Sequence, residues 1–228
     1  MLAFNNDYSH GAHPAVLQAL VDTNMEPQPG YGTDAHTERA KQLIREACQA
    51  PDADVFFLVG GTQANFTVIA AALRPYQGVL CASTGHIHVH ETGAVEGTGH
   101  KCLPLPQHEG KITAEQVRKA VLAQRNDPSA EHLVQPAMVY ISQSKDLGTL
   151  YTRKELEELA SVCRALGLYL FLDGARLGYA LAARSNDLTL EDIARLTDVF
   201  YIGGTKVGAL FGEAVVISNP QINRDFRY

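Results

Sequence analysis

Short apolar segments that alternate with longer helical patterns constrain the fold of this chain most strongly. Residues 55–59 read VFFLV and residues 168–172 read LYLFL, and both are nearly continuous apolar runs. Such runs are typical of strands buried on both faces, as in a parallel sheet that helices cover. We expect further strands at residues 79–82, 137–142, 199–202 and 214–217.

The stretches between these segments carry helix signals. Thr113 with Gln116, and Thr152 with Glu155, match the pattern of a capping box. Residues 34–50 and 62–74 have the apolar spacing of amphipathic helices. The alternation predicts an α/β fold of three layers, a mostly parallel sheet with helices on both faces. Ligands of such folds bind beyond the carboxyl ends of the strands, so we look for functional residues there.

The composition is that of a folded enzyme. With 228 residues the chain is expected to form one large core. The formal net charge of −6 and the lack of a basic stripe argue against a nucleic-acid partner. We expect no membrane association, because the sequence has no signal-peptide pattern and no apolar run long enough to cross a bilayer. Four widely spaced cysteines predict reduced thiols and a cytoplasmic protein.

Asp173 and Lys206 each follow an expected strand, 33 residues apart. Asp173 is also a good helix N-cap, and a lone lysine usually lies on the surface. Gly203 and Gly204 favour instead a close backbone approach before the lysine. A lysine amine can form a Schiff base with the aldehyde of pyridoxal 5′-phosphate, and a carboxylate can keep the pyridine nitrogen of that cofactor protonated. The pair therefore points to a pyridoxal-phosphate site.

Two further segments complete the expected site. Residues 59–65 (VGGTQAN) combine a strand end, a glycine turn and a helix start, where free backbone N–H groups can hold a phosphate, although such turns also serve as plain connections. His86, His88 and His90 could line one face of an extended segment and bind zinc, but no fourth ligand lies close in sequence. We expect no metal, and we place His86, which lies nearest the preceding strand, over the cofactor ring.

Six motifs, which cover essentially the whole chain in order, resemble those of the threonine aldolases. This family belongs to the β-eliminating lyase group of the fold-type I pyridoxal-phosphate enzymes. The motifs are residues 6–9 (NDYS), 29–32 (PGYG), 60–65 (GGTQAN), 85–86 (GH) through 91–94 (ETGA), 173–176 (DGAR) and 203–206 (GGTK).

The resemblance implies a set of cofactor contacts. Lys206 forms the Schiff base, Asp173 pairs with the pyridine nitrogen and His86 stacks on the ring. Arg176 reaches the phenolic oxygen of the cofactor or the carboxylate of the substrate. The residues implied to hold the phosphate are Gly61, Thr62 and Gln63.

The resemblance also implies a reaction, the retro-aldol cleavage of L-threonine or L-allo-threonine to glycine and acetaldehyde by a carbon–carbon lyase. Asn6 and Arg176 would bind the substrate, and Tyr31 would line the site of a neighbouring subunit in a homo-oligomer, a dimer or tetramer. The base that takes the β-hydroxyl proton would be His86, His132 or a water molecule between them.

The chain is expected to divide as the family does. Residues 1–12 would line the active site and residues 13–228 would form the cofactor-binding large domain, and we expect the C-terminal small domain of the family to be missing. Three alternatives stay open: another pyridoxal-phosphate lyase or aminotransferase on the same fold, an inactive remnant without the small domain, and an α/β binding module without a cofactor. Release of acetaldehyde from threonine would separate an aldolase from the first alternative.

Overall fold

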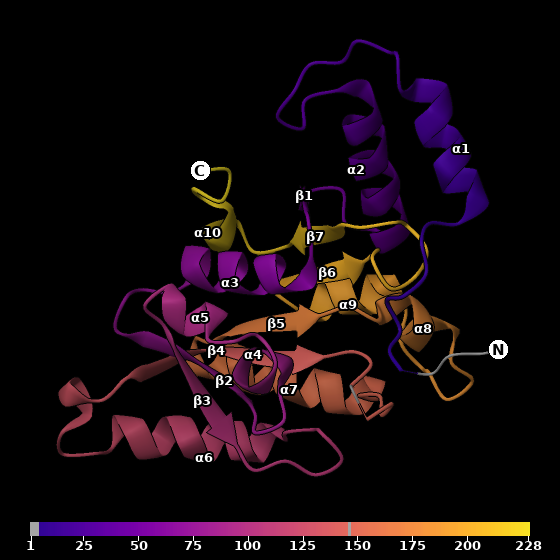
Figure 1. Ribbon diagram of the computed structural model, residues 1–228. Helices are drawn as coiled ribbons and strands as arrows, with labels where there is room; N and C mark the ends of the chain where they lie inside the picture. The colour runs from indigo at the N-terminus through magenta and orange to yellow at the C-terminus, as the bar shows by residue number, and fades with distance from the viewer. Residues whose placement is uncertain (1–4, 146) are drawn as a thin grey trace.

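A seven-stranded sheet forms the centre of the computed structural model, which describes residues 5–145 and 147–228 (Figure 1). The strand order is β1-β7-β6-β5-β4-β2-β3. All neighbouring strands pair in parallel except β7, which runs antiparallel to both β1 and β6. The strands are β1 (Asp54–Leu58), β2 (Gln77–Ala82), β3 (Lys101–Leu105), β4 (Gln135–Ser142), β5 (Tyr169–Asp173), β6 (Val199–Gly203) and β7 (Glu213–Ile217).

The predicted mostly parallel sheet between helix layers is confirmed, and each of the six predicted strands is present. The remaining strand, β3, was missed. It contains Lys101 and Pro104, which interrupt the apolar pattern. β3 lies at the edge of the sheet, where a proline is tolerated because one side of the strand has no partner.

Helices cover the two faces of the sheet and bury a separate apolar cluster on each side. Phe171, Tyr140 and Tyr201 fill the first cluster, and Leu156, Leu159 and Phe200 belong to the second. Burial of each such side chain stabilises the fold by roughly 1.5–3 kcal/mol. The first cluster is covered by α3 (Gly61–Ala72), α4 (His86–Val89), α5 (Ala94–Gly97) and α10 (Pro220–Asn223). The second is covered by α6 (Ala114–Arg125), α7 (Arg153–Leu166), α8 (Leu177–Ala182) and α9 (Leu190–Leu196).

Two N-terminal helices, α1 (Pro14–Thr23) and α2 (Ala35–Cys48), project from this body (Figure 1). α1 has no buried residue, and in α2 only Cys48 is buried. The amphipathic helices predicted at residues 34–50 and 62–74 correspond to α2 and α3, with α2 beginning after its N-cap Asp34.

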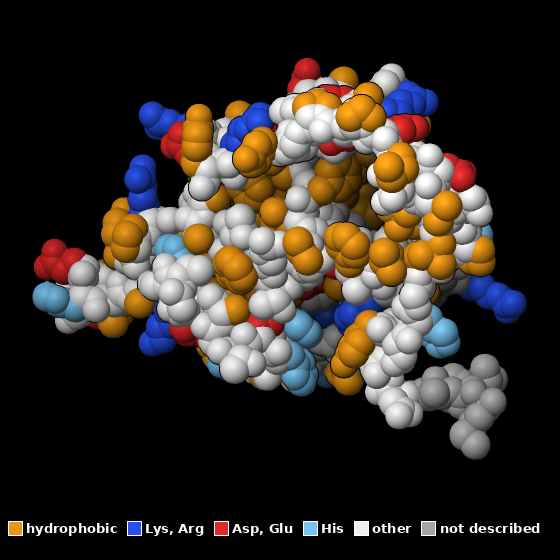
Figure 2. All heavy atoms as spheres, turned by 45° about the horizontal axis from the view of Figure 1, so that its top comes forward, with side chains coloured by type: hydrophobic (Ala, Val, Ile, Leu, Met, Phe, Trp, Pro, Cys, Tyr) orange, Lys and Arg blue, Asp and Glu red, His pale blue; other side chains and the backbone are white. Residues whose placement is uncertain are grey.

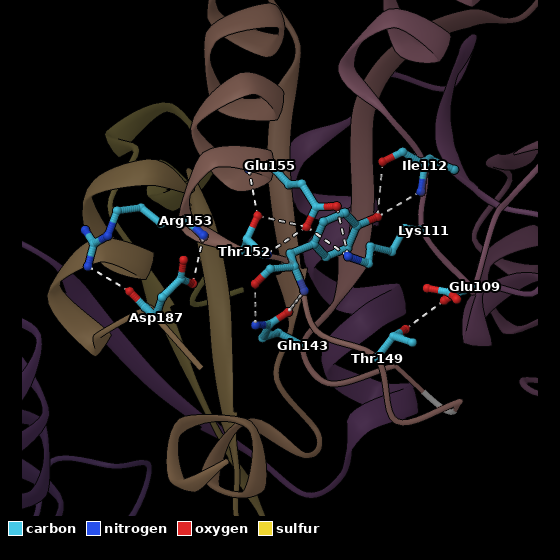
Figure 3. Close-up of polar contacts among 10 residues, drawn as sticks. Glu109, Lys111, Ile112, Gln143, Thr149, Thr152, Arg153, Glu155 and Asp187 are labelled. Atoms are coloured by element: carbon cyan, nitrogen blue, oxygen red, sulfur yellow. Dashed lines mark hydrogen bonds and ion pairs between the residues drawn. The ribbon is translucent and has the colours of Figure 1, made fainter. Parts of the chain in front are cut away.

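Both predicted capping boxes are confirmed. At the start of α7, Glu155 N donates to Thr152 Oγ1 at 3.3 Å and Thr152 N donates to Glu155 Oε2 at 2.8 Å, as Figure 3 shows. Lys111 Nζ lies 2.9 Å from Glu155 Oε1 and ties the connection between β3 and α6 to this turn. A third box, formed by Thr189 and Asp192 before α9, was not predicted because Asp replaces the usual Glu or Gln.

The described residues include no helix that is both long and apolar enough to cross a bilayer. All four cysteines are buried and unpaired. Burial raises the pKa of Cys48 to about 11 and that of Cys163 to about 12, so both remain protonated thiols at neutral pH.

Candidate functional site

A cavity of about 370 Å³ lies at the carboxyl ends of the parallel strands. Its walls come from six segments: the N-terminal segment, the β1–α3 turn, and the residues after β2, β4, β5 and β6. Figure 2 shows basic, acidic and histidine side chains close together around a hollow below the centre of the face drawn. The cavity therefore lies at the end of the α/β sheet where ligands are expected to bind.

Lys206 lines this cavity from the loop between β6 and β7, and buried Glu213 holds that loop. Gly204 N donates to Glu213 Oε2 at 3.1 Å, and Thr205 Oγ1 donates to Glu213 Oε1 at 2.9 Å. Burial raises the pKa of Glu213, although both hydrogen bonds oppose the rise. A Cβ at Gly203 would lie 2.5 Å from Ala175 O, so the glycines do permit the close backbone approach predicted from the sequence.

Asp173 ends β5 and is 5% exposed at the cavity wall. Its Oδ1 accepts from Ala175 N at 2.9 Å, and its Oδ2 accepts from Asn65 Nδ2 at 3.2 Å and from the Tyr140 hydroxyl. Burial, together with the charge of Asp173, raises the pKa of Tyr140 well above its usual value. The hydroxyl therefore stays protonated and donates to the carboxylate. Asp173 is not the N-cap of α8, since that position belongs to Arg176.

The amino end of α3 opens into the same cavity through Gly60, Gly61 and Thr62. Gly60 is the N-cap and supplies no side-chain hydrogen bond, so the first N–H groups of the helix have no capping oxygen. This is the arrangement that binds phosphate. Gln63 lies outside the cavity lining, and its Oε1 accepts from Val59 N at 2.8 Å, which closes the β1–α3 turn.

Arg176 lines the cavity and pairs with Asp7 of the N-terminal segment. Arg176 Nη2 lies 3.2 Å from Asp7 Oδ1, and Lys206 Nζ lies 4.0 Å from the same oxygen. Partial burial alone would raise the pKa of Asp7, but the hydrogen bond from Arg176 and the two positive charges lower it. The carboxylate therefore stays ionised and holds both cations at the cavity.

Of the N-terminal segment expected to line the site, Tyr8 reaches the cavity, and residues 1–4 lie outside the described residues. The ring centroid of Tyr8 is 5.9 Å from Lys206 Nζ. Asn6, the expected substrate contact, is exposed and is not part of the lining. Its Oδ1 instead accepts from Tyr8 N at 3.1 Å and Ser9 Oγ at 2.6 Å, which shapes the turn that presents Asp7 and Tyr8.

His86 opens α4 and faces the cavity, with its Nδ1 2.7 Å from Glu91 Oε1. The extended conformation considered for the three histidines is wrong. Residues 86–89 form a helical turn, in which alternate residues do not share a face. Within residues 5–145 and 147–228, no group of three or more His, Cys, Asp or Glu side chains is placed to hold a metal.

Two expected site residues lie elsewhere. His132 is exposed in a 3₁₀ turn (Ala130–His132) just before β4, at the amino end of the sheet. The eight residues of β4 separate that end from the cavity by roughly 25 Å, so the expected approach of His132 to the substrate hydroxyl is wrong within this chain. Tyr31 is 100% exposed with a φ of 64° and also lies outside the cavity.

Several site residues were not predicted. Asn65 and Glu91 lie within the GGTQAN and ETGA motifs, but the sequence offered no role for them. Asn65 contacts Glu91 across 26 positions and Asp173 across 108 positions, which no local pattern predicts. Tyr140 and Glu213 were hidden in apolar strand patterns. A polar residue inside or beside an otherwise apolar strand was the only available signal.

Comparison with known proteins decides the family. Residues 6–227 match the family described as beta-eliminating lyase. The chain belongs to the beta-eliminating lyase family. Within it, the chain is 33% identical to the low specificity L-threonine aldolase of Pseudomonas aeruginosa over 227 residues, which cover 99% of this chain and 64% of the relative.

Solved structures agree with this membership of the beta-eliminating lyase family. The threonine aldolase of Leishmania major superposes with a TM-score of 0.94 at 49% identity, over 97% of this chain and 64% of that one. An aspartate aminotransferase of Thermus thermophilus shares the fold, with a TM-score of 0.71 at 16% identity, over 94% of this chain and 56% of that one. The chain thus spans about 64% of the length of the threonine aldolases it matches.

Proposed function

We propose that this chain is the cofactor-binding part of a threonine aldolase that cleaves L-threonine or L-allo-threonine to glycine and acetaldehyde. The observation that carries the proposal is the meeting of Lys206, Asp173 and the uncapped amino end of α3 in one cavity. The similarity to threonine aldolases of Pseudomonas aeruginosa and Leishmania major supports it.

The beta-eliminating lyases depend on pyridoxal 5′-phosphate, and the residues of the cavity fit this cofactor. The volume of about 370 Å³ lies in the usual range for a small-molecule site, roughly 300–1,000 Å³. The amine of Lys206 suits the aldehyde, the carboxylate of Asp173 suits the ring nitrogen, and the N–H groups of Gly61 and Thr62 suit the phosphate. These three kinds of group come from different strand ends, so they surround the cavity.

When bound, the cofactor supplies an electron sink for the electron pair released as the substrate Cα–Cβ bond breaks. The chain supplies the rest. Lys206 would hold the cofactor through its amine, at the aldehyde end of the cavity. Three donors orient the carboxylate of Asp173, which would hold the proton of the ring nitrogen. Arg176 would hold the carboxylate of the substrate. His86, oriented by Glu91, would take the proton of the substrate hydroxyl.

Trapping of the cofactor tests the proposal. Borohydride reduction of the protein with pyridoxal phosphate, followed by mass mapping, should place a pyridoxyl group on Lys206. Lys206→Ala should lose both this adduct and the absorption band of the lysine–cofactor bond, with an unchanged circular dichroism spectrum. An unchanged absorption band in the variant would refute the role of Lys206.

Product analysis separates the alternatives. Acetaldehyde and glycine in equal amounts from threonine identify the aldolase. An amino-group transfer to a keto acid would identify an aminotransferase instead. A pyridoxyl adduct without turnover would identify a cofactor-binding remnant, and no adduct in a folded protein would identify a binding module without the cofactor.

We also propose that the protein acts in the cytoplasm as a homo-oligomer, with Tyr31 directed to a neighbouring subunit. Apolar side chains exposed on α1 and in the loop after it support an association, among them Leu20 (50% exposed), Val21 (70%) and Met25 (88%). Sedimentation of the wild type and of Val21→Asp checks this proposal. A monomer for the wild type at micromolar concentration would contradict it.

A further inference from the structure

A single buried amide joins the two carboxylates beside the cavity. Asn65, in the second turn of α3, donates from Nδ2 to Glu91 Oε1 at 2.6 Å and to Asp173 Oδ2 at 3.2 Å. Asn65 is 1% exposed, and the Glu91 side chain is fully buried. The NH₂ group of the amide supplies two donors, so one amide can face both carboxylates at once.

The amide is the middle of a longer chain of hydrogen bonds. Glu91 Oε1 also lies 2.7 Å from His86 Nδ1, and Asp173 Oδ2 also accepts from the Tyr140 hydroxyl. The links therefore run from a histidine at the cavity, through Glu91 and Asn65, to the carboxylate that ends β5.

Two buried atoms in this series of hydrogen bonds, Glu91 Oε2 and Asn65 Oδ1, have no hydrogen-bond partner among the described residues. A buried carboxylate with one unpaired oxygen depends on the donors that its other oxygen retains. For Glu91 these are Asn65 Nδ2 and the ring nitrogen of His86. Movement of Asn65 toward either carboxylate therefore changes how well the other is stabilised.

We propose that Asn65 is a positioning residue that couples the His86–Glu91 pair to Asp173, so that the imidazole and the distant carboxylate respond to each other's charge. Assignment of His86 and Asp173 to a reaction rests on the proposed function, but the coupling itself is a property of the chain without cofactor. Under the proposed function, the coupling links the charge of His86, which takes the substrate proton, to the charge of Asp173, which holds the proton of the ring nitrogen.

Other charged groups also act on His86. The ring of His90 lies 5.5 Å from that of His86, and Arg176 and Lys206 line the same cavity. Asp173 also acts directly through space. The test must therefore separate coupling through Asn65 from these direct effects.

A double-mutant cycle on the cofactor-free protein makes this separation. The pH midpoint of the His86 ring is followed by long-range ¹H–¹⁵N NMR of histidine-labelled protein, with His86→Asn to assign the signal. Asp173→Asn should move the midpoint by about 0.5 pH unit or more in the wild type, which corresponds to roughly 0.7 kcal/mol. In an Asn65→Leu background the same change should move it by less than half as much.

The control is Thr67→Val, in the same helix and outside this chain of hydrogen bonds, which should leave the effect of Asp173→Asn at full size. If Asn65→Leu does not fold, Glu91→Gln replaces it, because glutamine keeps the shape and removes the charge that links Asn65 to His86. An equal shift in wild-type and variant backgrounds would show that Asp173 acts only through space and would overturn the proposal.

Borohydride trapping on Lys206 in the wild type tests the proposed function separately. Coupling without a pyridoxyl adduct would refute the function and retain the role of Asn65. An adduct without coupling would retain the function and refute the role of Asn65.

Discussion

Tyr151→Phe removes one buried hydroxyl from the polar cluster between β4 and α7 (Figure 3). Tyr151 is 1% exposed; its hydroxyl accepts from Ile112 N at 3.0 Å and lies 3.4 Å from Ile112 O. The side chain of Gln143 separately holds the backbone of Tyr151, with bonds of 2.9 and 3.1 Å. Phenylalanine keeps the ring, over which Lys145 Nζ lies at 4.6 Å, so the substitution isolates the hydroxyl.

The expected loss follows from the group left behind. Without the hydroxyl, the buried N–H of Ile112 loses its acceptor, which costs about 1–3 kcal/mol of unfolding free energy. For a chain of this size each kcal/mol corresponds to a melting temperature change of about 2–4 °C. Burial raises the pKa of Tyr151, so its contribution is complete below the ordinary tyrosine pKa and would be lost only in strong alkali. The loss should therefore be the same throughout neutral pH.

Urea unfolding monitored by circular dichroism measures this loss. The matched control is Tyr76→Phe, because Tyr76 is 62% exposed and its change should stay within about 0.5 kcal/mol. Tyr151 does not line the cavity, so cofactor trapping on Lys206 should persist in the folded variant. A Tyr151→Phe protein as stable as the control would refute the argument that this hydroxyl satisfies a buried N–H.

Three further predictions concern the site. Gly61→Ala should weaken pyridoxal-phosphate binding about tenfold by titration, since its Cβ would lie 3.1 Å from the rigid Tyr201 hydroxyl, whereas Gly60→Ala meets nothing within 4 Å and should bind normally. Glu213→Gln should gain stability relative to wild type as pH rises from about 4 to 7. The pKa of Glu213 is higher in the folded protein than in the unfolded chain, so this carboxyl stabilises the wild type at low pH and loses that contribution as pH rises; parallel urea profiles would contradict this. Asp7→Asn should show the opposite trend in the same assay, losing stability relative to wild type as pH rises through about 4, because its pKa is lowered by cationic partners despite partial burial.

Local patterns in the sequence predicted most of the elements. A capping box needs only residues three positions apart, so Thr113 and Thr152 could be recognised as helix starts without any knowledge of the fold. Continuous apolar runs located six strands because burial on both faces leaves its mark on each strand separately. The ends of β5 and β6 then placed Asp173 and Lys206 at one edge of the sheet.

Contacts between distant segments were decided by the tertiary structure. Periodicity carries no strand direction, so the antiparallel insertion of β7 between β1 and β6 was not predictable from its apolar run. The expected approach of His132 to the substrate failed because a residue next to a strand in sequence can lie at either end of the sheet. The sequence by itself determined which residues begin helices and follow strands. Only folding brought Asn65 to Asp173, because a hydrogen bond across 108 positions depends on side-chain geometry that no local pattern encodes.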